Sequence, residues 1–331
     1  MALLVTGGAG YIGSHTVRLL AEAGEKVVVL DSMELGHRSA VVSPGVQLVQ
    51  GDLGDAQVVE DVFRAHGISA VLHFAAYALV GESVTDPLKY YRNNLASPLV
   101  LLEAMQRHGC RQFVFSSTCA TYGNPVTVPM DETHPQEPIN PYGASKLMLE
   151  RVLRDCVSAC GIQHVMLRYF NASGCSADAL IGEDHEPETH LIPRALMAVK
   201  GEVPPLTVFG NDYPTPDGTC IRDYIHVEDL AQAHADALRY LRNGGMATAC
   251  NLGTGTGVSV LEMLRLMEAV TGKPVPHVYG PRRAGDPPEL VADPRKAKAV
   301  LGWEARWKDP RKMVEDAWRW ISGPRGGRYG D

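Results

Sequence analysis

The stretch TGGAGYIGSH at residues 6–15 decides the fold class. It follows a short apolar run and leads directly into a segment with helical spacing. Its glycines Gly7, Gly10 and Gly13 recur at every third position. One glycine permits a tight turn, one lets the backbone approach a pyrophosphate, and one lets the helix pack closely on the strand. The pattern indicates a dinucleotide-binding loop.

An acidic residue follows at the place where such a loop needs one. The second apolar run, KVVVLD, ends at Asp31. A carboxylate there binds the adenosine ribose hydroxyls and repels a 2′-phosphate, so the sequence favours NAD over NADP. The alternative, a glycine-rich turn with no ligand, is disfavoured by the loop and the acid together. Asp52 ends the third run, and we expect it either to meet the adenine edge or to cap the next helix.

Apolar runs alternate with helical segments through the first half of the chain. Continuous runs rich in valine and leucine are typical of parallel strands covered on both faces. The runs lie at 2–7, 26–31, 46–52, 70–76, 112–118 and 164–170, with helical spacing at 14–24, 56–67, 93–109 and 141–161. This alternation predicts an α/β fold with a Rossmann-type doubly wound parallel sheet and right-handed crossovers.

The pattern changes after about residue 172, where prolines and glycines become dense. We therefore expect an NAD-binding domain at 1–171 and a smaller, mixed α/β substrate domain at 172–331, with an approximate boundary and an interleaved chain. Three of the predicted helices end at a glycine suited to stop them, at Gly24, Gly67 and Gly109.

The bulk composition is that of an ordinary globular protein. The 331 residues are 45% hydrophobic and 21% charged, with a net charge of −7. This charge argues against a broad grip on nucleic acid or anionic lipid, although a local phosphate pocket is compatible with it. No apolar run reaches the length of a bilayer span, and the N-terminus lacks the cationic flank of a signal peptide, so we expect a cytoplasmic protein with no membrane partner. The seven scattered cysteines are predicted to be free thiols, and we expect no metal site.

The segment PYGASK places Tyr142 and Lys146 four residues apart on a predicted helix. Positions i and i+4 share a helix face, so both side chains can point at one cofactor. A neighbouring ammonium and a positive nicotinamide would both lower the phenol's pKa from its usual value of about 10. Upstream, a strand ends with Ser116 and Thr118 at the sheet edge where ligands bind. Taken alone, the tyrosine and lysine would be a solvated helix face, but with Thr118 they form a proton-handling set beside the dinucleotide.

These segments resemble a known family. GGAGYIGSH, PYGASK and the set of Thr118, Tyr142 and Lys146 are similar to the extended short-chain dehydrogenase/reductase superfamily. FAAYALVGES, YYRNN, LRYFNASG, NLGTG and RRAGDPPELVADP narrow the resemblance to the UDP-glucose 4-epimerases, also called UDP-galactose 4-epimerases. The most specific segment is VFGNDYPTPDGTCIRDYIHVEDLA, and the resemblance covers nearly the whole chain.

The resemblance implies an activity. It is the reversible C4 epimerisation of UDP-glucose and UDP-galactose, which belongs to galactose metabolism. The reaction passes through a 4-keto sugar, with transient hydride transfer to tightly bound NAD⁺. Tyr142 would take the proton of the sugar 4-hydroxyl, Thr118 would hydrogen-bond the 4-oxygen, and Lys146 would hold the nicotinamide ribose and lower the Tyr142 pKa. A homodimer formed through a helix pair is also implied.

The loop and the resemblance together give a set of binding positions. The expected NAD contacts are Gly7, Gly10, Tyr11, Ile12, Gly13, Asp31, Asp52, Leu53, Phe74, Ala75, Ala76, Asn93, Ser116, Tyr142, Lys146 and Tyr169. The UDP-sugar contacts that the resemblance implies are Thr118, Tyr142, Asn171, His190, Leu191, Phe209, Arg222, Arg283 and Asp286. The two arginines match diphosphate ligands and Asp286 a uridine ribose ligand, while Phe209 could equally be a core residue. A salt bridge or turn role is the alternative for each.

Three positions depart from the usual pattern of this family. Thr118 replaces a serine, and Ala78 stands where some members have a lysine near the cofactor. Leu290 lies where side-chain size tunes access for N-acetylated sugars, and leucine is intermediate in size. Activity on UDP-N-acetylhexosamines is therefore open at this point.

Individual residues argue for or against other functions that the same fold supports. A 4,6-dehydratase needs an Asp–Glu pair just after Thr118, where this chain has Cys119 and Ala120. Epimerases of UDP-glucuronate, UDP-xylose or UDP-N-acetylhexosamines are not excluded, because pocket shape decides among them. A non-catalytic NAD-binding sensor is disfavoured because Tyr142 and Lys146 are both present.

Overall fold

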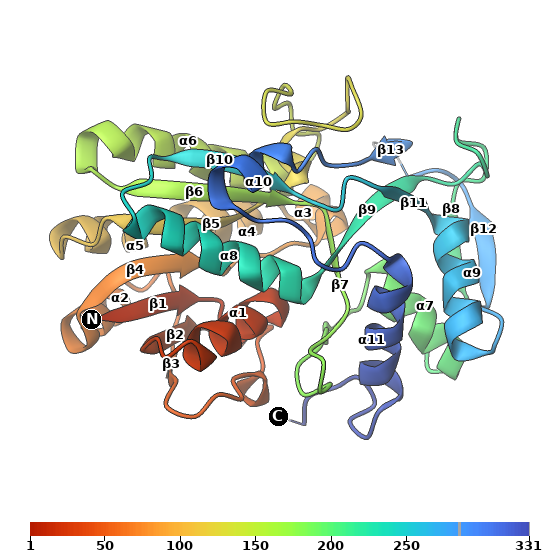
Figure 1. Ribbon diagram of the computed structural model, residues 1–331, viewed down its shortest axis with the longest axis horizontal. Coiled ribbons are helices and arrows are strands. Elements are labelled where there is room, and N and C mark those ends of the chain that lie inside the picture. The colour runs from red at the N-terminus through yellow and green to blue at the C-terminus, as the bar shows by residue number, and fades with distance from the viewer. Residues whose placement is uncertain (284–285, 331) are drawn as a thin grey trace.

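Seven parallel strands form the central sheet of the larger part of the molecule (Figure 1). The computed structural model describes residues 1–283 and 286–330. In spatial order the strands are β10 (Thr248–Leu252), β6 (Gln163–Tyr169), β5 (Gln112–Thr118), β4 (Ile68–His73), β1 (Ala2–Thr6), β2 (Val27–Asp31) and β3 (Gln47–Gln50). The predicted Rossmann-type fold is confirmed. The sheet also takes in β10, which comes from the second half of the sequence.

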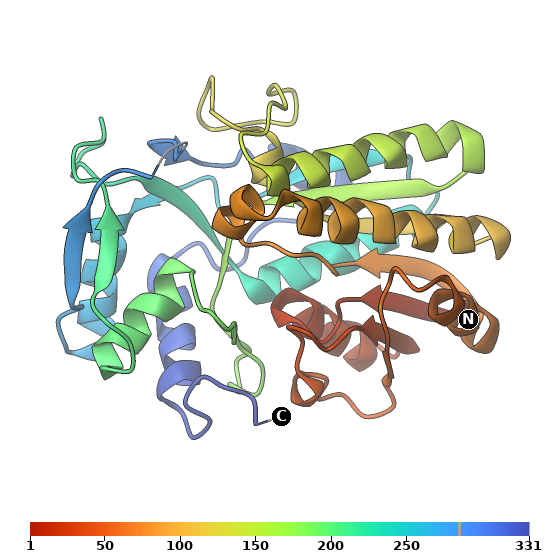
Figure 2. The ribbon, with the colours of Figure 1, turned by 180° about the vertical axis from the view of Figure 1, so that it is seen from behind.

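Helices cover both faces of this sheet, one set in front in Figure 1 and the other in front in Figure 2. One face carries α1 (Tyr11–Glu22), α8 (Val227–Arg242) and α10 (Arg295–Leu301), and the other α2 (Ala56–His66), α5 (Ser97–Arg107) and α6 (Pro141–Cys160). Leu3 and Val5 belong to the first apolar cluster, whereas Leu4 belongs to the second. Because successive side chains of a strand point to opposite faces, a strand covered on both sides needs an unbroken apolar run.

Several helix ends follow from local sequence. Asp55 caps α2 by accepting from the backbone N–H of Gln57 at 2.9 Å, and Gly67 ends this helix in the left-handed conformation. The predicted helix at 93–109 departs from expectation, since a π-helical turn (Arg92–Ala96) precedes α5. Pro98 lies at the start of α5 and has no N–H to donate to the turn before it.

The smaller part is a mixed α/β layer, as predicted. β9 (Ile221–His226) is its central strand, paired with β11 (Gly257–Ser259) antiparallel and with β7 (Asn171–Ser173) and β13 (Glu289–Leu290) parallel. A separate pair joins β8 (Leu206–Phe209) to β12 (His277–Gly280). The helices α7 (Leu191–Lys200), α9 (Val260–Thr271) and α11 (Pro310–Ser322) pack in a common apolar cluster.

Short elements complete the chain, and the surface is mixed in charge. These elements are α3 (Val80–Thr85), α4 (Pro87–Tyr91) and the 3-10 turns Arg38–Ala40 and Cys119–Thr121.

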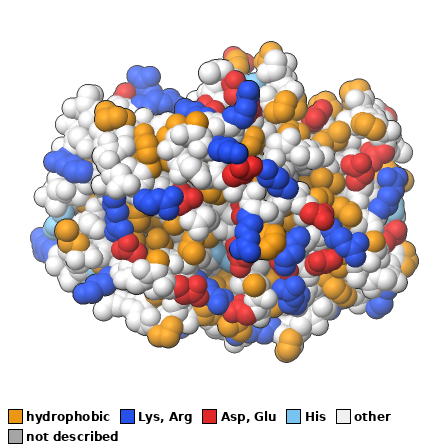
Figure 3. All heavy atoms as spheres, in the orientation of Figure 1, with side chains coloured by type: hydrophobic (Ala, Val, Ile, Leu, Met, Phe, Trp, Pro, Cys, Tyr) orange, Lys and Arg blue, Asp and Glu red, His pale blue; other side chains and the backbone are white. Residues whose placement is uncertain are grey.

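Among the described residues, no helix has the length and apolar character needed to cross a membrane. Basic and acidic side chains are interspersed on the face drawn in Figure 3. All seven cysteines are free, as predicted.

Candidate active site

The carboxyl ends of neighbouring parallel strands meet at one edge of the large sheet. The register aligns Thr6 with His73, and Thr118 with Tyr169. The loops that leave β1, β2, β4 and β5 therefore begin side by side, and Asp31 lies at the end of β2. Ligands of open α/β sheets bind at such an edge. The structure thus gathers the predicted cofactor and catalytic positions of the first half of the chain.

The glycine loop has the shape of an anion cradle. Gly7 has φ +71°, and an added Cβ would lie 2.5 Å from the backbone nitrogen of Ala75. A Cβ at Gly13 would lie 2.1 Å from the Gly7 carbonyl oxygen, whereas the nearest atom to a Cβ at Gly10 is 3.5 Å away. The outer side of Gly10 is open. α1 begins at Tyr11 with no side-chain cap on its free N–H groups. These donors suit a pyrophosphate, and the residues present fit NAD.

The two predicted acidic ligands differ in their surroundings. Asp31 is buried, and its Oδ2 accepts from the backbone N–H of Ala9 at 2.9 Å, which fixes it against the glycine loop. Asp52 is exposed and accepts from the N–H of Gly54 at 2.7 Å. It does not cap α2, because Asp55 does.

Burial has the largest effect on the pKa of the Tyr142 phenol. Tyr142 is the second residue of α6, 9% exposed, after the cap Asn140. Burial raises the pKa of Tyr142 well above its usual value, and Tyr169 adds to the rise, whereas a hydrogen bond with Thr118 lowers the pKa. Deprotonating this phenol therefore requires a positive charge close enough to outweigh burial. Thr118 thus acts on the phenol with which it was predicted to work.

The ammonium lies one helical turn later and is also buried. Lys146 is 3% exposed, and its Nζ donates to the carbonyl oxygen of Ser116 at 3.0 Å. Burial lowers the pKa of Lys146 to about 7, and the carboxylate of Glu150 opposes this shift. In this geometry the ammonium bonds to the strand and not to the phenol, so the lowering of the Tyr142 pKa by Lys146 stays a prediction.

A buried ion pair that sequence reasoning missed ties α6, which carries Tyr142 and Lys146, to the sheet. Glu150 on α6 accepts from Arg168 on β6 at 2.6 Å and from the hydroxyl of Ser117 on β5 at 2.7 Å. Arg168 also donates to the Tyr122 hydroxyl at 2.9 Å. All four residues are buried. The signal was Arg168, a charged residue inside the apolar run at 164–170, because a buried charge requires a partner.

The remaining predicted NAD contacts lie around the same edge. The hydroxyls of Ser116 and Tyr169 are 2.8 Å apart, and the Tyr11 hydroxyl donates to the Gly174 carbonyl at 2.7 Å. Asn93 lies in the π-helical turn and donates to Asn94 at 2.9 Å. The other positions are Ile12 at the start of α1, Leu53 buried after β3, and Phe74, Ala75 and Ala76, partly buried after β4.

The predicted diphosphate and uridine positions come from separate segments. Arg222 on β9 forms an ion pair with Asp286 and donates to the Pro287 carbonyl at 2.9 Å. The Arg283 guanidinium lies 4.0 Å from the centre of the Phe209 ring. The structure thus joins these four predicted residues in two pairs. An ion pair was also the alternative for the arginines, so their role toward a ligand stays a prediction.

Three further positions complete the predicted substrate side. Asn171 starts β7 and donates to the Asp223 carbonyl at 3.0 Å. Leu191 is the first residue of α7, and His190 precedes it with its Nδ1 2.6 Å from an oxygen of Glu183. That acidic partner of His190 was not foreseen. Leu290 on β13 is aligned with Arg222 and packs in the cluster that includes Cys119, next to the threonine.

Residues 3–253 match the family described as the NAD dependent epimerase/dehydratase family. The chain belongs to this family. A UDP-glucose 4-epimerase of Streptococcus mutans is 51% identical over 329 residues, covering 98% of each chain. The structure of a UDP-glucose 4-epimerase of Brucella ovis, solved with NAD, is 49% identical with a TM-score of 0.93, and covers 96% of this chain and 97% of that one. A second structure, of a UDP-glucose 4-epimerase of Stenotrophomonas maltophila, is 42% identical with a TM-score of 0.93, and the match covers 97% of this chain and 98% of that one. It was solved with bound NAD and a formylated UDP-arabinopyranose.

The family match begins in β1 and ends just after β10. It therefore takes in every strand of the large sheet and the predicted catalytic residues Thr118, Tyr142 and Lys146. Leu290, which lies beyond this range, is covered by the full-length epimerase relatives. The family match thus covers the predicted NAD-binding residues, and the similarity to the full-length relatives also covers the predicted UDP-sugar-binding residues beyond residue 253.

Proposed function

We propose that the chain interconverts UDP-glucose and UDP-galactose by inverting C4 of the sugar with bound NAD. One observation carries the proposal. Thr118, Tyr142 and Lys146 lie at the end of β5, at the same carboxyl edge of the sheet as the glycine loop, in a chain about half identical to UDP-glucose 4-epimerases over nearly its whole length. The relatives solved with NAD support the cofactor.

NAD⁺, when bound, supplies the reversible acceptance of a hydride from C4 of the sugar. Tyr142 takes the proton of the 4-hydroxyl in the same step and later returns it. Thr118, which lowers the pKa of this phenol, holds the 4-oxygen. Lys146 and the positive charge of an oxidised nicotinamide oppose the effect of burial on the phenol.

The substrate side holds the nucleotide and leaves the sugar free. Arg222 and Arg283 are suited to a diphosphate, because a guanidinium matches phosphate oxygens. Asp286 binds the uridine ribose. Anchoring at the nucleotide would allow the 4-keto sugar to turn and present its other face, and with bound NAD supplying the hydride, return of the proton by Tyr142 would leave C4 inverted.

We further propose a cytoplasmic homodimer. Large apolar side chains are exposed on the layer formed by α3 to α6: Val80, Val84, Leu88, Leu99 and Met148. Several exposed apolar side chains on one layer favour association with another surface. Free cysteines suit a reducing compartment. Light scattering of the purified chain and of Leu99→Arg tests the dimer, and a variant mass equal to wild type would count against this surface.

Proton NMR of the purified protein tests the reaction. UDP-galactose, with no NAD added, is expected to be converted to UDP-glucose. Tyr142→Phe is expected to lose about 10²-fold or more of the rate while retaining NAD. Full activity in that variant would refute the role of the phenol. No conversion by wild type, even with NAD supplied, would favour another uridine-nucleotide sugar or the sensor.

A further inference from the structure

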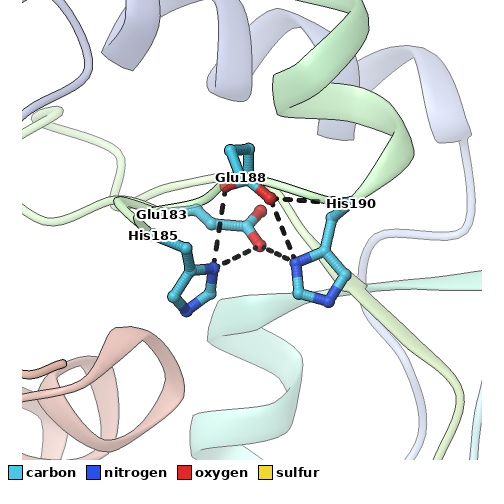
Figure 4. A group of neighbouring side chains, drawn as sticks. All are labelled: Glu183, His185, Glu188 and His190. Carbon is cyan, nitrogen blue, oxygen red and sulfur yellow. Dashed lines mark hydrogen bonds and ion pairs between the residues drawn. The ribbon is translucent and has the colours of Figure 1, made fainter. Parts of the chain in front are cut away.

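Four side chains of one short loop direct their ligand atoms to a common point (Figure 4). The Nδ1 atom of His190 lies 2.6 Å from Glu183 Oε1 and 3.4 Å from Glu188 Oε1. The Nδ1 atom of His185 lies 3.3 Å from Glu183 Oε1 and 3.6 Å from Glu188 Oε2. Ligands at the usual zinc distance of about 2.0–2.1 Å are separated by about 3.3 Å in a tetrahedron. Three of the four distances are close to this separation, and the His190–Glu183 pair would have to open by less than about 1 Å to admit an ion.

Hydrogen bonding among these groups does not account for the arrangement. The Nδ1 atom of His185 is buried and within ion-pair distance of both carboxylates, yet it makes no hydrogen bond of acceptable direction. Two protonated imidazoles facing two carboxylates would balance in charge and would explain His190, but they would leave this atom poorly satisfied. A buried polar atom whose contacts are poorly directed for hydrogen bonding requires an explanation, and a bound cation provides one.

The loop is held in place around the point. The Glu183 backbone oxygen accepts from the indole N–H of Trp320 at 2.9 Å. The Glu188 carboxylate accepts from the N–H groups of Thr189 and His190 at 2.7 and 2.8 Å. Both carboxylate side chains are almost fully buried, with exposures of 7% and 5%. A cavity of about 10 Å³ borders Glu183, His185 and Glu188, close to the room that one water requires.

We propose that Glu183, His185, Glu188 and His190 bind one divalent transition-metal ion, with Zn²⁺ the best fit. Two imidazoles and two carboxylates are ligands that zinc accepts in tetrahedral sites. Imidazole also suits Ni²⁺, Co²⁺ and Cu²⁺, whereas Mg²⁺ and Ca²⁺ prefer oxygen alone. The sequence signal is the spacing E-x-H-x-x-E-x-H over 183–190, which sequence analysis did not single out.

The ion would stabilise the loop at 183–190, which lies between a predicted NAD contact and two predicted substrate contacts. The Tyr11 ring at the start of α1 lies edge-on to the His185 ring, with centroids 6.4 Å apart. His190 and Leu191 at the other end of the loop begin α7 and are predicted substrate contacts. The ion orders this loop and takes no part in the chemical step. Its removal is expected to raise the KM for the UDP-sugar more than it changes kcat.

Metal binding is tested on the full NAD-bound protein after dialysis against a chelator. Titration with Zn²⁺ against a competing chromophoric chelator is expected to give one ion per chain. His185→Gln and Glu188→Gln are expected to lose about tenfold or more in affinity. His66→Gln, an imidazole at the end of α2 outside the loop, is the matched control and should bind as wild type does. Zn²⁺ should raise the unfolding temperature of wild type and the control but not of the two variants.

X-ray absorption of zinc in the wild-type protein covers the case in which the variants fail to fold. Only nitrogen and oxygen ligands at about 2.0–2.1 Å, with imidazole scattering, are expected. Sulfur at about 2.3 Å would assign the ion to cysteines and overturn the proposal. Failure of the folded wild type to bind Zn²⁺ or Co²⁺, or unchanged affinity in folded variants, would make the cluster an ion-pair network only.

Discussion

Replacement of Lys146 by methionine tests how strongly burial acts on the pKa of this predicted catalytic lysine. Burial lowers the pKa of this ammonium from 10.5 to about 7 in the folded protein. In the unfolded chain this lysine keeps its usual pKa. Between about pH 7 and pH 10 the unfolded chain therefore binds more protons than the folded chain at this position. Wild-type stability therefore falls as the pH is lowered from about 10 to 7. Methionine keeps the apolar stem and removes the titration.

The magnitude follows from the two pKa values. Folding with the lysine costs about 4 kcal/mol at pH 7 and about 1 kcal/mol at pH 10, relative to a group that does not titrate. The stability of Lys146→Met relative to wild type should therefore improve by about 3 kcal/mol between pH 10 and pH 7. Loss of the hydrogen bond to the Ser116 carbonyl costs about 1–3 kcal/mol at every pH, so the slope and not the offset is diagnostic.

Urea unfolding of NAD-free protein at several pH values between 7 and 10 measures the slope. The exposed Lys26→Met is the matched control, and its stability difference from wild type should not change with pH. If the Lys146→Met difference were as flat as that of the control, burial would not depress the pKa of this lysine, and the electrostatic description of the site would be wrong.

Three further perturbations test other parts of the account. Glu150→Gln leaves the buried Arg168 without its counter-charge and should cost about 3–5 kcal/mol in urea unfolding, and a loss below 1 kcal/mol would contradict the role of this pair. Gly7→Ala places a Cβ against the loop after β4 and should weaken NAD binding about tenfold or more, whereas Gly24→Ala, at a similar φ with open space, should bind NAD as wild type does. Leu290→Cys should raise the rate on UDP-N-acetylgalactosamine relative to UDP-galactose in coupled assays, and an unchanged ratio would exclude a gating role.

The large sheet could be predicted from sequence because its physics is local. Val5 and Leu30 belong to continuous apolar runs, which strands buried on both faces require. The carboxyl-edge rule then placed Asp31 and Thr118 near the glycine loop. The short strands after residue 172 were not predicted singly, because β13 has only two residues and gains its pairing from β9.

What escaped prediction depends on contacts between distant segments. Lys146 donates a hydrogen bond to the Ser116 carbonyl, 30 positions earlier in the sequence. Nothing in the sequence indicated that burial lowers the pKa of this lysine. Glu150 finds Arg168 across 18 positions in sequence, so only the folded chain shows the pair. The cluster around His185 is the exception, because its partners lie within five residues of it and the spacing E-x-H-x-x-E-x-H was visible in the sequence.

The most direct test of the central claim follows a label through the reaction. UDP-galactose carrying deuterium at C4 is incubated with the purified protein, and the UDP-glucose formed is examined by NMR. If the hydrogen leaves C4 as hydride and returns from the same bound cofactor while Tyr142 handles only the hydroxyl proton, the product keeps its deuterium at C4. Loss of the label to solvent would mean that C4 exchanges a proton, and the account of the site would be wrong.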